Sequence, residues 1–387
     1  MQNGNGAITT GAIDADGHVL EPPDLWETYL EPKYRDRALR IRTNRDGLEI
    51  LEIDGKQSWT GYPGFPGQLS GMGKEDIDPR PDRTYLRGAP AGSMDPKERV
   101  ARLDEEGLAK AILYPTLGLF LGEIKDPELA TAHCRAYNRW ILDFCSESGG
   151  RLIPIAQVTL DDDPHNAAAE LERAVKDGAK GGFFLPFTWK KQSPGHPHFD
   201  PLWAKAEELG VPLGIHPTAD PPELDVHKRF SELAQGDQFD FTWYMDVLVS
   251  QGMVQSFVSL FHYGLFDRFP QVKLVVLESQ AGWTGHILDR MDAVWRSPLG
   301  KTTRMKESPK TYFNRQCWVS ADPDEQMASA VINAVGSDRF FWASDFPHPD
   351  HISHYMQALG DMIAPLSEES QHQILWENVS KAYNLGE

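Results

Sequence analysis

The chain has 387 residues, of which 57 are acidic and 38 basic, so its formal net charge at pH 7 is −19. That balance argues against nucleic acid and anionic membranes as main partners. A hydrophobic fraction of 40% is typical of a folded protein with a real core, and no apolar run reaches the length needed to cross a bilayer. The three cysteines form no C-x-x-C pair, which predicts reduced thiols and a cytoplasmic location.

Eight short apolar runs alternate with longer amphipathic segments along the chain. The runs predicted as strands are Ala12–Ala15, Ala111–Tyr114, Ile153–Val158, Gly182–Leu185, Pro212–Ile215, Leu274–Leu277, Cys317–Ser320 and Phe340–Ala343. The segments predicted as helices are Pro96–Glu106, Pro127–Glu147, Pro164–Lys176, Pro201–Glu208, Gly252–Phe269, Gly285–Val294 and Asp324–Val335. Repeated strand–helix units predict a parallel sheet, and eight of them favour an α/β fold, a (β/α)₈ TIM barrel that forms one domain over residues 1–387.

Two long segments interrupt this alternation. The first is an insertion at residues 21–95, after the first strand, in which Asp54-Gly55 follows an apolar run and signals a hairpin turn. Within it, the Gly- and Pro-rich stretch Tyr62–Gly73 predicts an irregular rim. The second segment, residues 216–251, follows the fifth strand. Because barrel active sites are built from the loops after the strands, we expect these segments to govern substrate choice.

Side chains that bind metal ions lie at three of the predicted strand ends. Asp16 and His18 follow the first strand two residues apart, so an extended backbone points both to one face. His216 ends the fifth strand and Asp345 ends the eighth. We expect the four side chains to converge at the barrel mouth and to form an open site for one divalent metal ion. Carboxylates with imidazoles suit zinc, manganese or ferrous iron.

These motifs, in this order along nearly the whole chain, resemble the amidohydrolase superfamily. More narrowly, they resemble the amidohydrolase-related group that includes aminocarboxymuconate semialdehyde decarboxylase and the resorcylate-type decarboxylases. The motifs that carry the resemblance are Ile13–Pro22, Gly214–Pro217, Phe266–Pro270 leading to Leu277-Glu278, and Ala343–His348. The resemblance implies a (β/α)₈ barrel and one divalent metal ion whose ligands are Asp16, His18, His216 and Asp345. We expect this ion to be zinc before manganese or iron.

The chain departs from the group's pattern at two positions. Many relatives carry His-x-His on the first strand, where this chain has Asp16. Relatives of the semialdehyde decarboxylase carry a histidine that acts as acid or base at the end of the sixth strand, where this chain has Glu278. A glutamate transfers protons when its pKa is raised. No lysine stands where binuclear amidohydrolases place a carbamylated one, which argues against that kind of two-metal site.

Four further residues are weaker candidates for contact with the metal ligands or the substrate. His348 follows Asp345 closely and would orient it. Glu21 would pair with an arginine at the rim. His262 lies on a helical stretch, where a packed histidine is commoner than a ligand, and Trp243 lies in the second insertion, where it would stack on a flat substrate.

The first functional hypothesis is a hydrolase or carboxy-lyase that acts on a small carboxylated or aromatic substrate through a mononuclear metal site, with Asp345 and Glu278 as catalytic groups. Either carboxyl would protonate the carbon that loses CO₂, whereas in hydrolysis Asp345 would take the proton of a metal-bound water. A non-haem iron oxygenase on the same barrel is the alternative, with His262 or His348 extending the site to two irons. A third hypothesis is a non-catalytic subunit beside an active relative. We expect a homo-oligomer, or a hetero-oligomer with such a related subunit.

Overall fold

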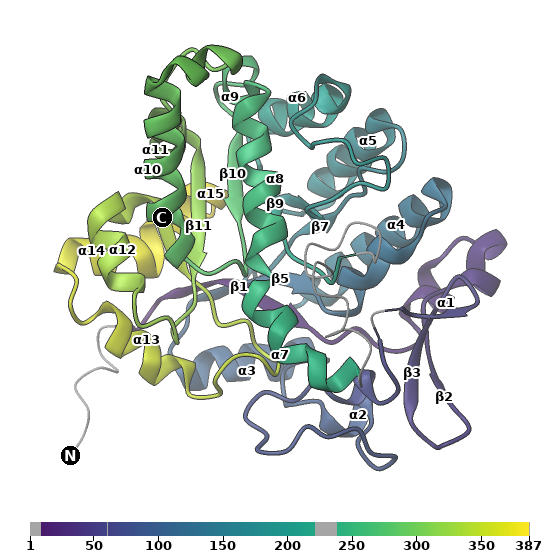
Figure 1. Cartoon of the computed structure of the whole chain (residues 1–387). Coiled ribbons are helices and arrows are strands. Elements are labelled where there is room, and N and C mark those ends of the chain that lie inside the picture. Colours follow the sequence, from purple (N-terminus) through teal and green to yellow (C-terminus); the bar gives the residue numbers. More distant parts are fainter. Residues whose placement is uncertain (1–8, 60, 221–237, 387) are drawn as a thin grey trace, which may run out of the picture.

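The strands of the barrel are parallel and lie side by side at the centre of the molecule, surrounded by helices (Figure 1). The computed structural model describes residues 9–59, 61–220 and 238–386. In chain order the barrel strands are β1 (Ile13–Val19), β5 (Lys110–Pro115), β6 (Leu152–Pro154), β7 (Ala156–Gln157), β8 (Gly182–Phe184), β9 (Pro212–Ile215), β10 (Lys273–Val276), β11 (Cys317–Ala321) and β12 (Phe340–Trp342).

Hydrogen bonds between neighbouring strands close this arrangement into a ring. β1 pairs with β5 and β5 with β6, while β7 to β12 pair in sequence order. Only Ile155 separates β6 from β7, so these two form one barrel strand and join the two sheets. After β12, the Asp345 amide donates to the Asp16 carbonyl at 2.9 Å and the His18 amide donates to the Phe346 carbonyl at 2.8 Å. These bonds connect the last strand to the first, and the predicted TIM barrel is confirmed.

Helices follow the strands around the outside of the barrel. They are α3 (Pro96–Glu106), α4 (Pro127–Ser146), α5 (Pro164–Lys176), α6 (Asp200–Leu209), α7 (Gln238–Leu248), α8 (Ser250–His262), α9 (Leu265–Arg268), α10 (Gly282–Arg296), α11 (Pro309–Gln316), α12 (Ala328–Val335), α13 (Tyr355–Ile363), α14 (Glu368–His372) and α15 (Asn378–Tyr383). Three of them are capped by the aspartate of an Asp-Pro pair: the carboxylates of Asp95, Asp126 and Asp163 accept hydrogen bonds from first-turn amides. Aspartate caps the free amides and proline fits the first turn, which is why these starts are predictable.

Three of the predicted boundaries are wrong. The segment Gly252–Phe269 is not one helix, because Gly264 adopts φ +64° and separates α8 from α9. The helix expected from Asp324 begins only at Ala328. The first strand was expected to end at Ala15, whereas β1 runs on to Val19 through an irregular register between Asp14 and Gly17.

The insertion after β1 forms a small layer of its own. It contains α1 (Leu25–Tyr29), α2 (Tyr85–Gly88) and an antiparallel sheet of β2 (Arg40–Thr43), β3 (Glu49–Ile53) and β4 (Lys56–Gln57). The predicted hairpin turn joins β3 to β4, with φ +54° at Asp54 and +70° at Gly55. The Tyr62–Gly73 stretch is largely buried, and a Cβ at Gly73 would lie 2.6 Å from the Ser353 Cβ. The rim therefore packs against the loop that follows β12.

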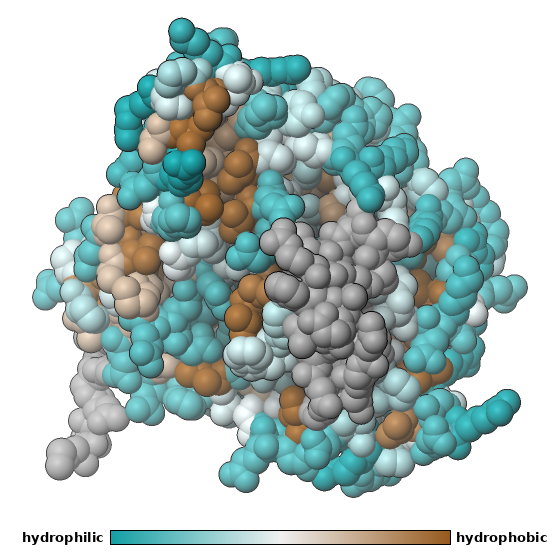
Figure 2. Space-filling model, in the orientation of Figure 1, coloured by the Kyte–Doolittle hydropathy of each residue, from teal (hydrophilic) through white to brown (hydrophobic). Residues whose placement is uncertain are grey.

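The outer surface is mostly hydrophilic on the face shown in Figure 2, with apolar residues in separate patches. Among the described residues, no helix has both the length and the apolar character of a bilayer-spanning segment. Residues 221–237 of the second expected insertion lie outside the described part of the chain.

Candidate metal centre

The four side chains predicted to hold a metal ion meet at the carboxyl ends of their strands. His18 Nε2 lies 3.0 Å from Asp345 Oδ1 and 3.2 Å from His216 Nε2. Asp16 Oδ1 lies 3.6 Å from the first imidazole nitrogen and 3.7 Å from the second. All four side chains are buried. The barrel thus brings residues more than 300 positions apart into one set of candidate metal ligands.

The hydrogen bonds of the two imidazoles aim their free nitrogens into this set. His18 Nδ1 lies 2.7 Å from the Pro115 carbonyl, and His216 Nδ1 lies 2.9 Å from the Pro217 carbonyl. A carbonyl oxygen only accepts, so these partners assign the proton of each ring to Nδ1. Each Nε2 then presents a lone pair, and the two lone pairs face each other across 3.2 Å. This arrangement repels unless a cation lies between the nitrogens.

The carboxylates around the imidazoles accept no well-formed hydrogen bonds, and the nearest donor beside them is His348 Nδ1, 3.1 Å from Asp345 Oδ2. Both oxygens of Asp16 and of Asp345, and Oε2 of Glu278, are buried without a well-formed hydrogen bond. Glu278 Oε2 lies 3.3 Å from His216 Nε2 and 3.8 Å from His18 Nε2, so it faces the same space. Buried charges are costly unless they are paired or coordinate a metal. Five unpartnered carboxylate oxygens and two free imidazole nitrogens fit a divalent cation.

The backbone of two of these residues is strained. Glu278 has φ +40° and Asp345 has φ +52°, a region that costs a non-glycine residue about 1–3 kcal/mol. The Glu278 amide donates to the Ser320 hydroxyl at 3.0 Å, and the Asp345 amide donates to the Asp16 carbonyl. Such strain concentrates at functional sites. Here the positive φ angles of Glu278 and Asp345 direct both carboxylates toward the imidazoles.

The surroundings shift the pKa values of Glu278 and Asp345 in opposite directions. Burial, together with the charges of Asp345 and Asp350, raises the pKa of Glu278 well above its usual value. Burial also opposes ionisation of Asp345, but the neighbouring His348 and His18 hold its pKa well below the usual value. Burial lowers the pKa of His18, which keeps this imidazole in the neutral form that binds metals.

A buried network below the centre ties β1 to the end of β12. Asp14 accepts hydrogen bonds from the Ser344 amide at 2.9 Å and the Ser344 hydroxyl at 2.7 Å. The Arg99 guanidinium donates to the His18 carbonyl at 2.8 Å and lies 4.0 Å from the Asp14 carboxylate. Burial raises the pKa of Asp14 to about 6. Sequence analysis missed this network, whose only signal was a carboxylate and an arginine in apolar surroundings.

We expect Gly17→Ala to destabilise the fold and displace the two ligands that flank it. A Cβ at Gly17 would lie 2.5 Å from Arg99 Nη2 and 2.7 Å from Asp14 Oδ2. Overpacking of this kind costs about 1–3 kcal/mol, which would appear as a lower melting temperature. Gly285→Ala on α10 is the control, since its Cβ would meet no atom closer than 3.9 Å and alanine favours a helix. Equal melting temperatures for Gly17→Ala and the wild type would contradict this account.

Glu21 has a different role from the one expected. Its Oε2 accepts the amides of Thr116 and Leu117 at 3.1 and 2.8 Å, and its Oε1 accepts the Gly118 amide at 2.8 Å. These amides begin the 3₁₀ helix Leu117–Glu123 that follows β5. The expected arginine partner is therefore replaced by three backbone donors. Burial, only partly offset by these donors, raises the pKa of Glu21 to about 7.

Glu21 should make stability depend on pH. Its folded-state pKa of about 7 exceeds the ordinary value of 4.5, so the folded protein binds this proton more tightly than the unfolded chain does. The stabilisation is complete below the unfolded pKa and is lost as pH rises through the folded pKa, a change of about 3 kcal/mol. Glu21→Gln cannot titrate, so its stability relative to the wild type should improve between about pH 5 and pH 8. Urea unfolding of both proteins measures this, and identical pH dependence would contradict it.

The remaining candidates lie in different places. His348 Nδ1 is 3.1 Å from Asp345 Oδ2 and its Nε2 is 2.9 Å from the Thr116 hydroxyl, so it orients Asp345. His262 is exposed at the end of α8, and Trp243 is 74% exposed on α7. In the described part of the chain, neither contacts the four proposed ligands. The His351 imidazole, 3.7 Å from Asp345 Oδ2, was missed although it stands six residues after that aspartate.

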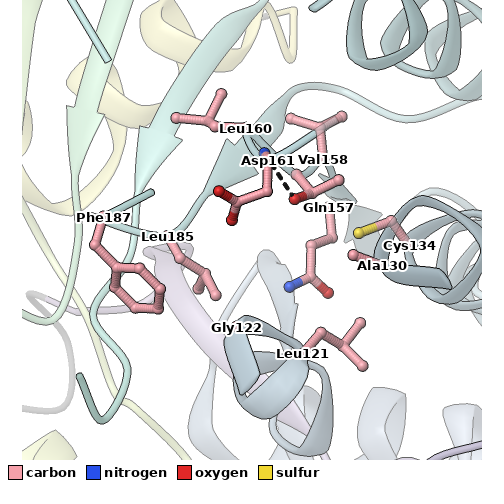
Figure 3. A pocket seen from close by; sticks show the side chains of 11 residues that line it. Leu121, Gly122, Ala130, Cys134, Gln157, Val158, Leu160, Asp161, Leu185 and Phe187 are labelled. Atoms are coloured by element: carbon pink, nitrogen blue, oxygen red, sulfur yellow. Dashed lines mark hydrogen bonds between the residues drawn. The ribbon is translucent and has the colours of Figure 1, made fainter. Parts of the chain in front are cut away.

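A small pocket with a volume of about 20 Å³ adjoins the 3₁₀ helix after β5, at the same end of the barrel (Figure 3). Its lining is Leu121, Gly122, Ala130, Cys134, Gln157, Val158, Thr159, Leu160, Asp161, Leu185 and Phe187. The Gln157 side chain points into it from β7, donates to the Gly118 carbonyl at 2.8 Å and leaves Oε1 without a partner. A pocket of about 20 Å³ has room for about one water molecule and is too small for an aromatic substrate.

The barrel and its ligand set define a metal-dependent (β/α)₈ enzyme. Residues 99–385 match the family model described as Amidohydrolase, and the chain belongs to that family. It is 24% identical over 307 residues to a gamma-resorcylate decarboxylase from Polaromonas sp., covering 74% of this chain and 86% of the relative.

Two solved structures are similar over the whole barrel. An amidohydrolase from Mycobacterium avium subsp. paratuberculosis has a TM-score of 0.79 at 21% identity, covering 97% of this chain and 99% of that one. A dihydroxybenzoic acid decarboxylase from Polaromonas sp., solved with bound manganese and the inhibitor 2-nitroresorcinol, has a TM-score of 0.65 at 20% identity, covering 97% of each chain.

Proposed function

We propose that this protein is a metal-dependent carboxy-lyase that removes CO₂ from a small hydroxylated aromatic acid. The observation that carries the proposal is the buried set of Asp16, His18, His216 and Asp345, whose facing lone pairs and unpartnered oxygens require a cation. The choice of reaction is supported by the gamma-resorcylate decarboxylase that the chain resembles over most of its length.

The proposed ligands are Asp16, His18, His216 and Asp345. A divalent ion bound there would act as a Lewis acid toward the substrate's carboxylate and a neighbouring oxygen. The carbonyl partners of the two histidines fix the ring orientations, and His348 orients Asp345. Supporting contacts of this kind maintain ligand geometry.

Glu278 is the proposed proton donor. In decarboxylation the bond between the ring carbon and the carboxylate breaks, its electron pair stays on the ring carbon, and that carbon takes a proton as CO₂ leaves. The Glu278 side chain is 14% exposed, whereas those of Asp16 and Asp345 are at most 2% exposed. Glu278 therefore faces both the ligand set and the solvent from which it can be reprotonated.

Zinc remains our proposed resident ion because two imidazoles favour it. One solved neighbour contains manganese, and finding manganese in this protein would overturn the proposal of zinc. Metal analysis of protein purified without added metal decides between them. We also propose a cytoplasmic homo-oligomer. The cysteines Cys134, Cys145 and Cys317 are free and buried, which suits a reducing compartment.

The decisive experiment is product analysis on a panel of hydroxybenzoates with the metal-loaded enzyme. We expect CO₂ and the corresponding phenol, with one deuterium on the ring when the reaction is run in D₂O. Oxygen consumption with a hydroxylated product, or hydrolysis of an amide panel without CO₂ release, would contradict the proposal.

A further inference from the structure

A second group of ligand atoms lies beside the metal centre, in the loop after β12. His351 Nε2 is 3.7 Å from Asp345 Oδ2 and 3.7 Å from Asp350 Oδ2. One ligand atom from each of these three residues lies within 4.8 Å of the others. We propose that Asp345, Asp350 and His351 form a second divalent-cation site, and that the Asp345 carboxylate bridges this site to the first.

The two oxygens of Asp345 face different partners. Oδ1 is 3.0 Å from His18 in the first ligand set, whereas Oδ2 is 3.1 Å from His348 Nδ1 and 3.7 Å from His351 Nε2 in the second. Asp345 is only 2% exposed, and neither oxygen accepts a well-formed hydrogen bond. A single cation bound near Oδ1 would leave Oδ2 without a cation. A carboxylate placed in this way is suited to hold two cations at the spacing of two-metal sites, about 3.5–4 Å.

The imidazole of His351 is arranged as in a metal ligand. Its Nδ1 is 3.5 Å from the Asp324 carboxylate, on the side away from Asp345. A histidine that binds a metal commonly donates its other ring N–H to a carboxylate, which fixes the tautomer and the ring orientation. With the proton on Nδ1, the Nε2 lone pair of His351 faces Asp345 and Asp350.

The charge around the centre also favours a second cation. Among the described residues, no lysine or arginine forms an ion pair with the carboxylates that surround it, namely Asp16, Glu278, Asp322, Asp324, Asp345 and Asp350. One divalent ion only balances the charges of Asp16 and Asp345, because Glu278, the proposed proton donor, holds its proton. The carboxylates of Asp324 and Asp350 beside His351 would still repel an aromatic carboxylate that enters this mouth. A second divalent ion would offset this negative charge around the centre.

The second site is more open than the first. The side chain of Asp350 is 34% exposed and that of His351 is 12% exposed, whereas His18 and His216 are fully buried. Three protein ligands leave positions for water or substrate. We therefore expect the second cation to bind more weakly than the first and to exchange with solvent ions.

Counting bound Mn²⁺ tests the second site without any substrate. Chelator-treated protein is dialysed to equilibrium against increasing MnCl₂, and bound metal is measured by mass spectrometry. The wild type should reach two ions per chain in two affinity steps, with an electron paramagnetic resonance signal of a coupled Mn pair. The double variant Asp350→Asn/His351→Gln should stop at one ion and lose the coupled signal. His354→Gln, an exposed histidine in the same loop, is the matched control and should still bind two.

A wild type that saturates at one ion per chain would overturn the second site, as would a double variant that still binds two. The inference rests on the metal-site part of the proposed function but not on the reaction, so it survives a negative decarboxylase assay. Binding of no ion by the wild type would overturn both sites. Asp350→Asn alone changes a partly exposed side chain and repeats the test if the double variant does not fold by circular dichroism.

Discussion

Replacing His216 with alanine is expected to empty the first metal site and reduce turnover to background. The variant loses the Nε2 lone pair that faces His18 at 3.2 Å and Glu278 at 3.3 Å. Loss of a mere supporting partner costs about 10–100-fold in metal affinity. Loss of the ligand itself should therefore exceed that range. Metal content after dialysis and the rate of CO₂ release measure the two effects.

His262→Ala is the matched control, because His262 is an exposed histidine at the end of α8. It should retain metal and full turnover. Thermal unfolding gives a third measurement, since an ion at 100 times its Kd stabilises the folded state by about 2.7 kcal/mol. The part of this gain that comes from the first site should be lost in His216→Ala, and the whole gain should persist in His262→Ala. If His216→Ala kept its metal and the gain, His216 would not be a ligand.

The main architecture and the convergence of the four candidate ligands could be predicted because each depends on local signals or on one general rule. Apolar runs mark the barrel strands, and Asp-Pro pairs such as Asp95-Pro96 fix helix starts through a capping carboxylate. Once the barrel is assumed, the rule that strand ends meet at one mouth brings Asp16, His18, His216 and Asp345 together. No side-chain detail is needed for that step.

The surroundings of the ligands could not be predicted, because they depend on contacts between distant segments. Asp14 and Ser344 are 330 positions apart, and only the closure of the barrel brings them into hydrogen-bond contact. The three amides that Glu21 accepts exist as a group only after the chain turns into a 3₁₀ helix. Likewise, the positive φ values of Glu278 and Asp345 are set by tertiary hydrogen bonds rather than by residue type.

Glu278→Gln is expected to separate proton transfer from metal binding. Glutamine keeps an oxygen near His216 but carries no transferable proton, so turnover should fall by about 10²–10⁴-fold, the usual contribution of a general acid. KM and the content of tightly bound metal should change little, because the four ligands remain. Asp345→Asn is the comparison, since it alters a carboxylate within 3.0 Å of His18 and should lower metal content as well as turnover.

The source of the proton that reaches the ring can be tested separately in Glu278→Gln. Slow residual turnover in D₂O should still place deuterium on the ring, because water then supplies the proton directly. Added formate or acetate should raise the rate of Glu278→Gln but not that of Asp345→Asn, since a small acid restores the missing donor only where the metal ligands are intact. Wild-type turnover in Glu278→Gln would contradict this role and assign the proton transfer to another group.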